Sequence, residues 1–171
     1  MEIVELDVAF ARAQGDALAQ LLLDAHHGSG MALGLAAPLT RERAKAEWLR
    51  LAGEADGETR LVLAALDGDE AVGAVSLARA RAENGGHRAE VQRLAVRGDR
   101  RGGGVGGALL DAVVERARGL GLELLWLTTH ADTPSDAFYV RRGWTRVGVV
   151  PKWSGRPDGE LTANAFFYLV L

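Results

Sequence analysis

A glycine-rich turn between a predicted strand and a predicted helix is the segment of this 171-residue chain best suited to hold a ligand. The turn runs over residues 97–107 and carries two adjacent arginines, Arg100 and Arg101. Glycines let backbone N–H groups point into a turn, and the start of a helix adds about half a positive charge. Both features favour an anion such as a phosphate group. The sequence therefore predicts an anion-binding loop.

The turn matches two known nucleotide-binding motifs, the P-loop and the dinucleotide fingerprint, only in part. A P-loop requires Lys and then Ser or Thr after its last glycine, whereas Gly107 is followed by alanine and leucine. Gly102, Gly104 and Gly107 reproduce the spacing of the dinucleotide fingerprint. However, the fingerprint lies several residues beyond the strand end at Val96, and the next strand does not end in an acidic residue. A dinucleotide-binding oxidoreductase remains an alternative.

The turn resembles the cofactor loop of the GNAT acetyltransferase superfamily. Arg101-x-x-Gly104-x-Gly106 is similar to that family's Gln/Arg-x-x-Gly-x-Gly/Ala signature. The resemblance implies that the loop amides bind the pyrophosphate of acetyl-CoA and that the preceding strand pairs with its pantetheine arm. The family commonly has Pro where Gly98 stands, a departure that we expect to loosen the turn. The implied cofactor contacts are Leu94, Ala95, Val96, Arg101, Gly102, Gly103, Gly104, Val105, Gly106 and Gly107.

A second segment is similar to the family's Asn-x-x-Ala-x-x-x-Tyr-x-x-x-Gly-Phe motif. The matching residues are Asp132, Ser135, Tyr139, Gly143 and Trp144, with Asp132 in place of the usual Asn. The resemblance implies cofactor contacts from Asp132, Ser135 and Tyr139, and it implies that Tyr139 is the catalytic acid that protonates the departing thiolate. A phenol with a reference pKa of about 10 is protonated at neutral pH, as a general acid must be. The alternative role for Tyr139 is packing on the sheet.

Glu90 is the candidate catalytic base. An acceptor amine must lose a proton before it attacks a thioester, and a carboxylate can take that proton directly or through water. Glu90 precedes Arg101 by eleven residues, a spacing that resembles the glutamate base of the family's histone-acetylating branch. Strand alternation predicts that Glu90 lies on the same face of the strand as Leu94 and Val96. We expect this face to border the cleft that holds the thioester of acetyl-CoA. The alternative is a surface glutamate paired with a neighbouring arginine.

Over nearly the whole chain, the resemblance narrows to the tabtoxin-resistance type of acetyltransferase. It is carried by Leu22-Leu23-Asp24 with Gly28-Ser29, by residues 87–91 and 143–148, by Pro157-Asp158-Gly159 and by Phe166-Phe167-Tyr168. It implies a small-molecule amine, such as an amino-acid-like antibiotic, in a pocket between the first two helices, loop 28–34 and loop 153–158. Such relatives often carry Asp at the position of Thr128. Any catalytic role of that aspartate therefore cannot be assigned to this chain. Protein N-terminal acetylation and a non-catalytic acyl-CoA sensor remain alternatives.

The composition fits one domain over residues 1–171, because 48% of the residues are hydrophobic and 25% are charged. A net charge of -3 argues against a nucleic-acid or anionic-membrane partner. The chain has no Cys, which excludes disulfides and a cysteine nucleophile and favours direct transfer in a ternary complex. No apolar run approaches the roughly 18 residues of a membrane span. We expect a cytoplasmic enzyme that uses acetyl-CoA and no metal, with a homodimer left open.

Hydrophobic periodicity predicts the elements that must position these residues. Helices are predicted over 9–25, after the N-cap Thr40, over 105–117 and over 135–142, and strands over 60–66, 71–77, 89–96, 122–128, 144–150 and 163–171. Asp67-Gly68 indicates a tight hairpin turn. Trp48 is assigned to the core by its helix position, with a wall of the acceptor pocket as the alternative. This order predicts an α+β fold of the GNAT type, in which helices flank a central mixed sheet.

Overall fold

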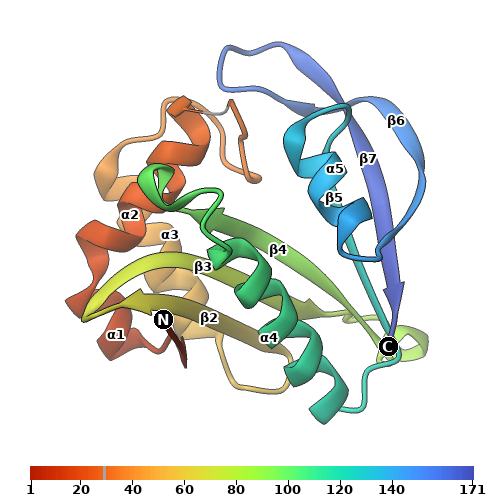
Figure 1. The fold of residues 1–171 in the computed structure, drawn as a ribbon, viewed down its shortest axis with the longest axis horizontal. Helices are drawn as coiled ribbons and strands as arrows, with labels where there is room; N and C mark the ends of the chain where they lie inside the picture. Colours follow the sequence, from red (N-terminus) through yellow and green to blue (C-terminus); the bar gives the residue numbers. More distant parts are fainter. Residues whose placement is uncertain (29) are drawn as a thin grey trace.

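A computed structural model describes residues 1–28 and 30–171 of the chain. Seven strands form one sheet in the order β1-β2-β3-β4-β5-β7-β6 (Figure 1). They are β1 (Glu2–Glu5), β2 (Arg60–Asp67), β3 (Glu70–Arg79), β4 (Arg88–Val96), β5 (Leu124–His130), β6 (Thr145–Gly155) and β7 (Leu161–Val170). All neighbouring strands are antiparallel except β4 and β5, which are parallel. The mixed sheet confirms the predicted α+β fold class.

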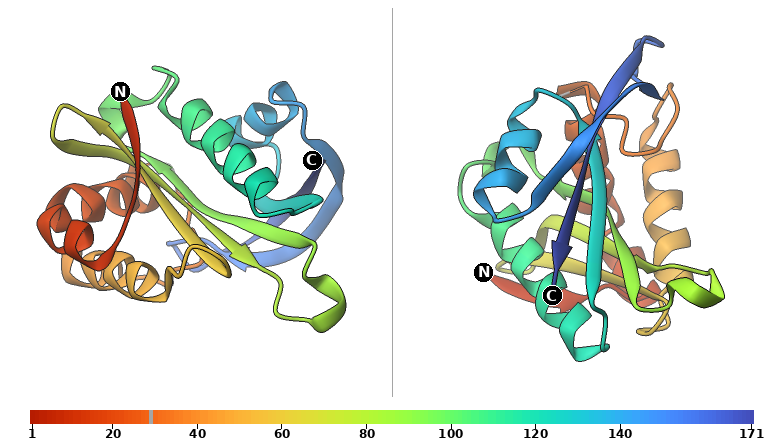
Figure 2. Two further views of the ribbon diagram at one scale, coloured as in Figure 1. Left: turned by 90° about the horizontal axis from the view of Figure 1, so that it is seen from below. Right: turned by 90° about the vertical axis from the view of Figure 1, so that its right-hand side faces the viewer.

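Helices cover both faces of the sheet. They are α1 (Val8–Ala13), α2 (Gly15–Leu23), α3 (Arg41–Glu54), α4 (Val105–Gly119) and α5 (Pro134–Arg141), with a π-helical turn η1 (Asp24–Gly28) and 3₁₀ turns η2 (Glu83–Gly85) and η3 (Gly98–Arg100). Helices α1, α2 and α3 lie on one face, and α4 and α5 on the other (Figure 2). Among the described residues, no helix combines the length and the hydrophobicity that a membrane span requires.

Strand alternation divides the apolar residues into two clusters. On β2, Leu61 and Leu63 belong to the cluster beneath α4, whereas Val62 belongs to the cluster beneath α2 and α3. Helix α4 lies very close to β3, because a Cβ atom on Gly73 would stand 2.8 Å from Cγ1 of Val105. Real Cβ atoms do not come that close without a shift, so glycine at this position fixes where α4 begins.

The structure departs from the predicted elements at three places. The helix predicted over 9–25 is interrupted at Gln14, whose side-chain amide donates to the carbonyl of Asp69 at 2.8 Å and accepts from the N–H of Ala71 at 3.3 Å. Gln14, at the break between the two helices, therefore holds the β2–β3 hairpin against them. Strand β1 was not predicted, because only two of its four residues are apolar. Strand β6 extends to Gly155, five residues beyond its predicted end.

Candidate functional site

The two parallel strands at the centre of the sheet separate after a short paired segment. Their register includes only Arg88↔Leu124, Ala89↔Leu125 and Glu90↔Trp126. Beyond these pairs β4 continues to Val96 and β5 continues to His130, and Figure 1 shows the two strands diverging. Backbone groups along the inner edges of such an opening can pair with an extended ligand. The opening is therefore a candidate site for a long, narrow molecule.

A β-bulge in β4 determines which side chains face each side of the opening. Pairing with β3 shifts between Ala74 and Ser76, and Arg93 adopts a left-handed conformation with φ +52°. The extra residue reverses the alternation of side chains beyond it. Leu94 and Val96 consequently pack with the α4-side cluster, whereas Ala95 packs with the cluster on the opposite face.

Glu90 precedes the bulge and lies on the face opposite to Leu94 and Val96. This follows because Ala89 and Val91, its neighbours on β4, belong to the α4-side cluster. The prediction that Glu90 shares one face with Leu94 and Val96 is therefore wrong, and the reason is the single inserted residue. At the opening, the Glu90 carboxylate therefore lies on one face of the sheet, and the apolar side chains of Leu94 and Val96 lie on the other face.

The glycine loop leaves the first N–H groups of α4 without protein acceptors. Gly102 and Gly104 have φ of +78° and +88°, a conformation that glycine adopts without strain, and Gly104 is the N-cap of α4. In the described part of the chain no side chain caps this helix, and no protein acceptor is found for the N–H groups of Val105, Gly106 and Gly107. Together with the helix dipole, these donors make the helix start suited to an anion.

Arg142 is a residue of this site that sequence reasoning missed. Its guanidinium lies so close to Gly107 that a Cβ atom there would stand 1.4 Å from Nη2. The guanidinium donates to both carboxylate oxygens of Asp111, at 3.0 and 2.9 Å, and lies 5.9 Å from the ring centre of Phe138. A cation beside a helix N-terminus is unfavourable, and the Asp111 carboxylate offsets this cost. The place of Arg142 inside the Tyr139 motif, directly before Gly143, is the sequence signal for this contact.

The two arginines of the loop are already engaged by protein groups. Arg101 donates from Nε to the carbonyl of Val96 at 3.2 Å, which folds its side chain over the end of β4. Arg100 forms an ion pair with Asp67 at 2.8 Å. The N–H of Gly103 donates to the carbonyl of Arg100 at 3.4 Å. Because each guanidinium has five N–H donors, these contacts leave others free, and the loop offers an anion both backbone and guanidinium donors.

The turn at Gly98 is fixed where we expected it to be loosened. Its N–H donates to Oδ2 of Asp24 in η1 at 2.6 Å. The other carboxylate oxygen accepts from Gln20 at 2.7 Å, and Gln20 accepts from Arg41 of α3 at 2.7 Å. A proline at this position could not donate this hydrogen bond. Gly98 therefore ties the anion loop to the helices on the other side of the sheet.

Glu90 lies at the base of the opening, half-buried and held by a neighbouring amide. Gln92 donates to its Oε2 at 2.7 Å and accepts from Arg60 at 3.3 Å. Burial raises the pKa of the Glu90 carboxyl above its ordinary value, against the hydrogen bond from Gln92 and the charges of Arg93 and Arg60. A half-buried carboxyl with a raised pKa has the character of a proton acceptor.

Tyr139 of α5 lies in an aromatic cluster against the sheet. Its ring centre lies 5.2 Å from Phe138, 5.9 Å from Trp144 and 5.6 Å from Phe167. Burial raises the pKa of the Tyr139 phenol well above its ordinary value. The hydroxyl group is therefore protonated at neutral pH, while the ring takes part in packing. Both predicted roles are compatible with this position.

Two further predicted cofactor contacts lie at the start of α5. The Ser135 hydroxyl donates to the sulfur of Met31 at 3.4 Å, so the segment after η1 reaches across to α5. Asp132 has 92% of its side chain exposed and pairs with Arg146 at 3.4 Å. Arg146 also pairs with Asp136 at 2.9 Å, and Asp136 accepts from the N–H of Asp132. Asp136, which the sequence did not single out, thus anchors this turn to β6.

The remaining sequence candidates take mostly structural positions. Trp48 is fully buried and donates its indole N–H to the carbonyl of Leu18 at 2.8 Å, so it belongs to the core rather than to a pocket wall. His26 is only 3% exposed and lies within η1, and His130 is buried at the end of β5. Trp153 lies in β6 rather than in a loop. Ser29, one of the residues of the tabtoxin-type resemblance, lies outside the described residues.

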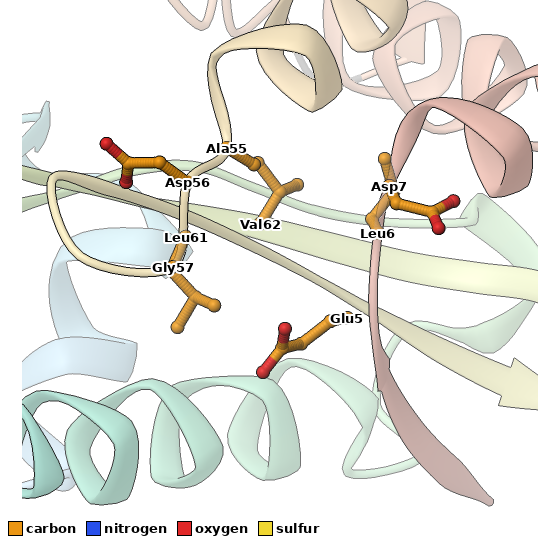
Figure 3. A pocket seen from close by; sticks show the side chains of 8 residues that line it. All are labelled: Glu5, Leu6, Asp7, Ala55, Asp56, Gly57, Leu61 and Val62. Carbon is orange, nitrogen blue, oxygen red and sulfur yellow. The ribbon is translucent and has the colours of Figure 1, made fainter.

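A hollow of about 260 Å³ at the β1 edge is not part of this site. Figure 3 shows that the carboxylates of Glu5, Asp7 and Asp56 around it point in different directions. Each is already engaged: Asp7 accepts from the N–H of Phe10, Asp56 accepts from three backbone N–H groups, and Glu5 pairs with Arg116. Within the described ranges, no three His, Asp or Glu residues are grouped so that they could hold a metal ion.

Comparisons with known proteins agree with this geometry. The model of the acetyltransferase (GNAT) family matches residues 17–144. A ribosomal-protein-alanine N-acetyltransferase from Brucella melitensis is 22% identical over 100% of both chains, with a TM-score of 0.74. A GCN5-related N-acetyltransferase from Kribbella flavida is 19% identical over 99% of this chain and 97% of that one, with a TM-score of 0.79. An aminoglycoside 6'-N-acetyltransferase complexed with coenzyme A is 19% identical over 99% of this chain and 97% of that one, with a TM-score of 0.74. At these identities the likeness shows the fold.

We expect Asp24→Ala to weaken binding of coenzyme A, because the variant removes the acceptor that fixes Gly98. The dissociation constant should rise about fivefold, the equivalent of about 1 kcal/mol, as measured by isothermal titration calorimetry. Asp99→Ala is the matched control, since it also removes one negative charge next to Gly98 but breaks only an exposed pair with Arg97. Equal dissociation constants for the two variants would contradict the anchoring role of Asp24.

Proposed function

We propose that this chain, which belongs to the acetyltransferase (GNAT) family, transfers the acetyl group of acetyl-CoA to the amine of a small molecule by direct attack in a ternary complex. The observation that carries the proposal is the opening between β4 and β5, which lies beside the uncapped start of α4. The family's fold binds acetyl-CoA. The proposal concerns the acceptor, the mechanism and the residues that act.

The residues around the opening suit a pyrophosphate and its extended arm. The free N–H groups of Val105, Gly106 and Gly107 would donate to the pyrophosphate, and Arg142 would add a positive charge beside them. The pantetheine arm would extend along Leu94 and Val96 on the α4 side of the sheet. Its thioester would then lie in the opening, within reach of groups from both faces.

The two sides of the opening divide the chemistry. The acceptor amine would enter on the α1–α3 face, where the Glu90 carboxylate takes its proton directly or through water. The amine nitrogen then forms a bond to the thioester carbon, and the carbon–sulfur bond breaks. The departing thiolate takes a proton from the Tyr139 phenol, which burial keeps neutral. Since the chain has no Cys, no cysteine thioester of the enzyme can intervene.

The tabtoxin-type resemblance belongs to the same proposal and suggests an amino-acid-like amine as acceptor. We also propose that residues 1–171 form one domain, because a single sheet includes strands from Glu2 to Val170. The fold does not support a dinucleotide-binding oxidoreductase. Among the described strands only β4 and β5 form a parallel pair, whereas the doubly wound fold needs a mostly parallel sheet.

The direct test combines ligand binding with acetyl transfer. Coenzyme A and acetyl-CoA should raise the melting temperature of the full chain, because both bind the folded state, whereas NAD and NADP should not. Acetyl-CoA with a panel of amino acids, aminoglycosides, polyamines and peptides should release free thiol in the presence of at least one small amine. Transfer to peptides alone would contradict the small-molecule acceptor. Tight binding of coenzyme A without any transfer would favour a sensor.

The pH profile distinguishes the roles of Glu90 and Tyr139. The Glu90 carboxylate is the active form, so the rate of the parent enzyme should fall as pH drops through the raised pKa of this group. Glu90→Gln should lose about 100-fold in rate at neutral pH and recover at higher pH, where more of the amine is already neutral.

Tyr139→Phe serves as the comparison for Glu90→Gln. It should lower the rate without moving the acidic limb of the profile, and it should leave the affinity for acetyl-CoA nearly unchanged, because only the departing sulfur needs the hydroxyl group. A loss in Glu90→Gln that is equal at every pH would show that Glu90 does not act as the base. An unchanged rate in Tyr139→Phe would show that Tyr139 does not act as the general acid and only packs against the sheet.

A further inference from the structure

We propose that the acceptor amine carries an aromatic or other apolar group, which packs in a hollow formed by β5, β6 and β7 next to Glu90. This inference deepens the proposed function, on which it rests, by naming the class of acceptor. The hollow has a volume of about 390 Å³. It is lined by Trp126, Val147, Gly148, Val149, Val150, Phe166, Phe167 and Tyr168.

The register of the sheet places this hollow beside Glu90. Glu90 pairs with Trp126 across β4 and β5, and Trp126 pairs with Tyr168 across β5 and β7. Side chains paired in this way lie on the same face, one strand spacing of about 4.8 Å apart. Since Leu125 and Phe167 pack on the α5 side, Trp126 and Tyr168 lie on the opposite face together with Glu90. The carboxylate and the aromatic wall therefore form one continuous row.

Among the described residues, no helix covers this part of the sheet on the Glu90 side. Helix α5 contacts β5 and β6 from the other face, and the contacts of α2 and α3 are with β2, β3 and β4 (Figure 2). On the uncovered face Trp153 packs edge-on against Phe166 at 4.8 Å between ring centres, and 53% of Trp153 is exposed. Exposed aromatic and aliphatic side chains gathered around a hollow are typical of binding sites.

The polar groups beside the hollow are already satisfied by one another. Asn164 donates to Thr128 at 3.4 Å and accepts from the hydroxyl of Ser154 at 2.8 Å. The lining itself is aliphatic and aromatic apart from the Tyr168 hydroxyl, the Trp126 indole N–H and backbone groups. A polyhydroxylated amine would lose more hydrogen bonds to water here than these few groups replace. An arylalkylamine would instead bury its ring and direct its ammonium group to the Glu90 carboxylate, past the face of Trp126.

The test uses the full chain and two primary amines of similar basicity, phenethylamine and ethanolamine. The first carries an aromatic ring, and the second carries a hydroxyl group. We expect kcat/KM for phenethylamine to exceed that for ethanolamine by at least about tenfold. Calorimetry with each amine in the absence of acetyl-CoA should give the same order of affinity. Trp126→Ala should raise KM for phenethylamine about tenfold with kcat little changed, and Trp126→Phe should restore most of the affinity.

Val170→Ala is the control, because it removes an exposed apolar side chain of β7 outside the hollow and should leave both amines unaffected. Equal or better use of ethanolamine or of an aminoglycoside would overturn the inference while leaving acetyl transfer intact. A dimer by analytical ultracentrifugation that dissociates in Trp126→Ala would also overturn it, since a second copy would then cover the hollow. Should Trp126→Ala fail to fold, the two-amine comparison on the parent chain decides. Failure to bind coenzyme A would instead contradict the proposed function.

Discussion

The limited pairing of β4 with β5 is the constraint on which the rest of the site depends. Three residue pairs form the ladder between β4 and β5, and beyond them both strands continue apart. A complete parallel ladder would satisfy these backbone edges internally and leave no room between the faces. Because the ladder stops, a thioester and an amine can approach from opposite sides. The bulge at Arg93 then assigns the apolar side chains to one side and Glu90 to the other.

Electrostatics at the start of α4 explains why the same region suits a polyanionic cofactor. Free N–H groups and the positive end of the helix dipole lie at one point, beside the guanidinium of Arg142 and its partner Asp111. The hydrogen bond from Gly98 to Asp24 connects this point to α2 and α3. The loop and the acceptor-side helices are therefore mechanically joined, and the loop geometry is fixed from outside its own sequence.

Local patterns allowed much of this fold to be predicted, because the hairpin, the strand–helix–strand unit and the glycine loop each lie within one short segment. The errors arise where distant contacts decide. Nothing in the sequence marks Arg93 as the bulged residue, since left-handed conformations favour glycine or asparagine. Arg142 reaches Gly107 only through the packing of α5 on α4. Asp24 meets Gly98 across 74 residues of chain. The sequence therefore indicated where the glycine loop lies, but it did not indicate the distant contacts that support the loop.

The central claim is that the opening and the uncapped helix start together hold acetyl-CoA. Amide chemical shifts and hydrogen exchange of the ¹⁵N-labelled chain, followed by NMR during titration with coenzyme A, test it most directly. The account predicts that the largest shifts and the strongest new protection occur at Gly104 to Gly107 and at Leu94 to Val96, because these are the amides at the loop and along the free edge. Unchanged amides in both segments at saturating coenzyme A would contradict it.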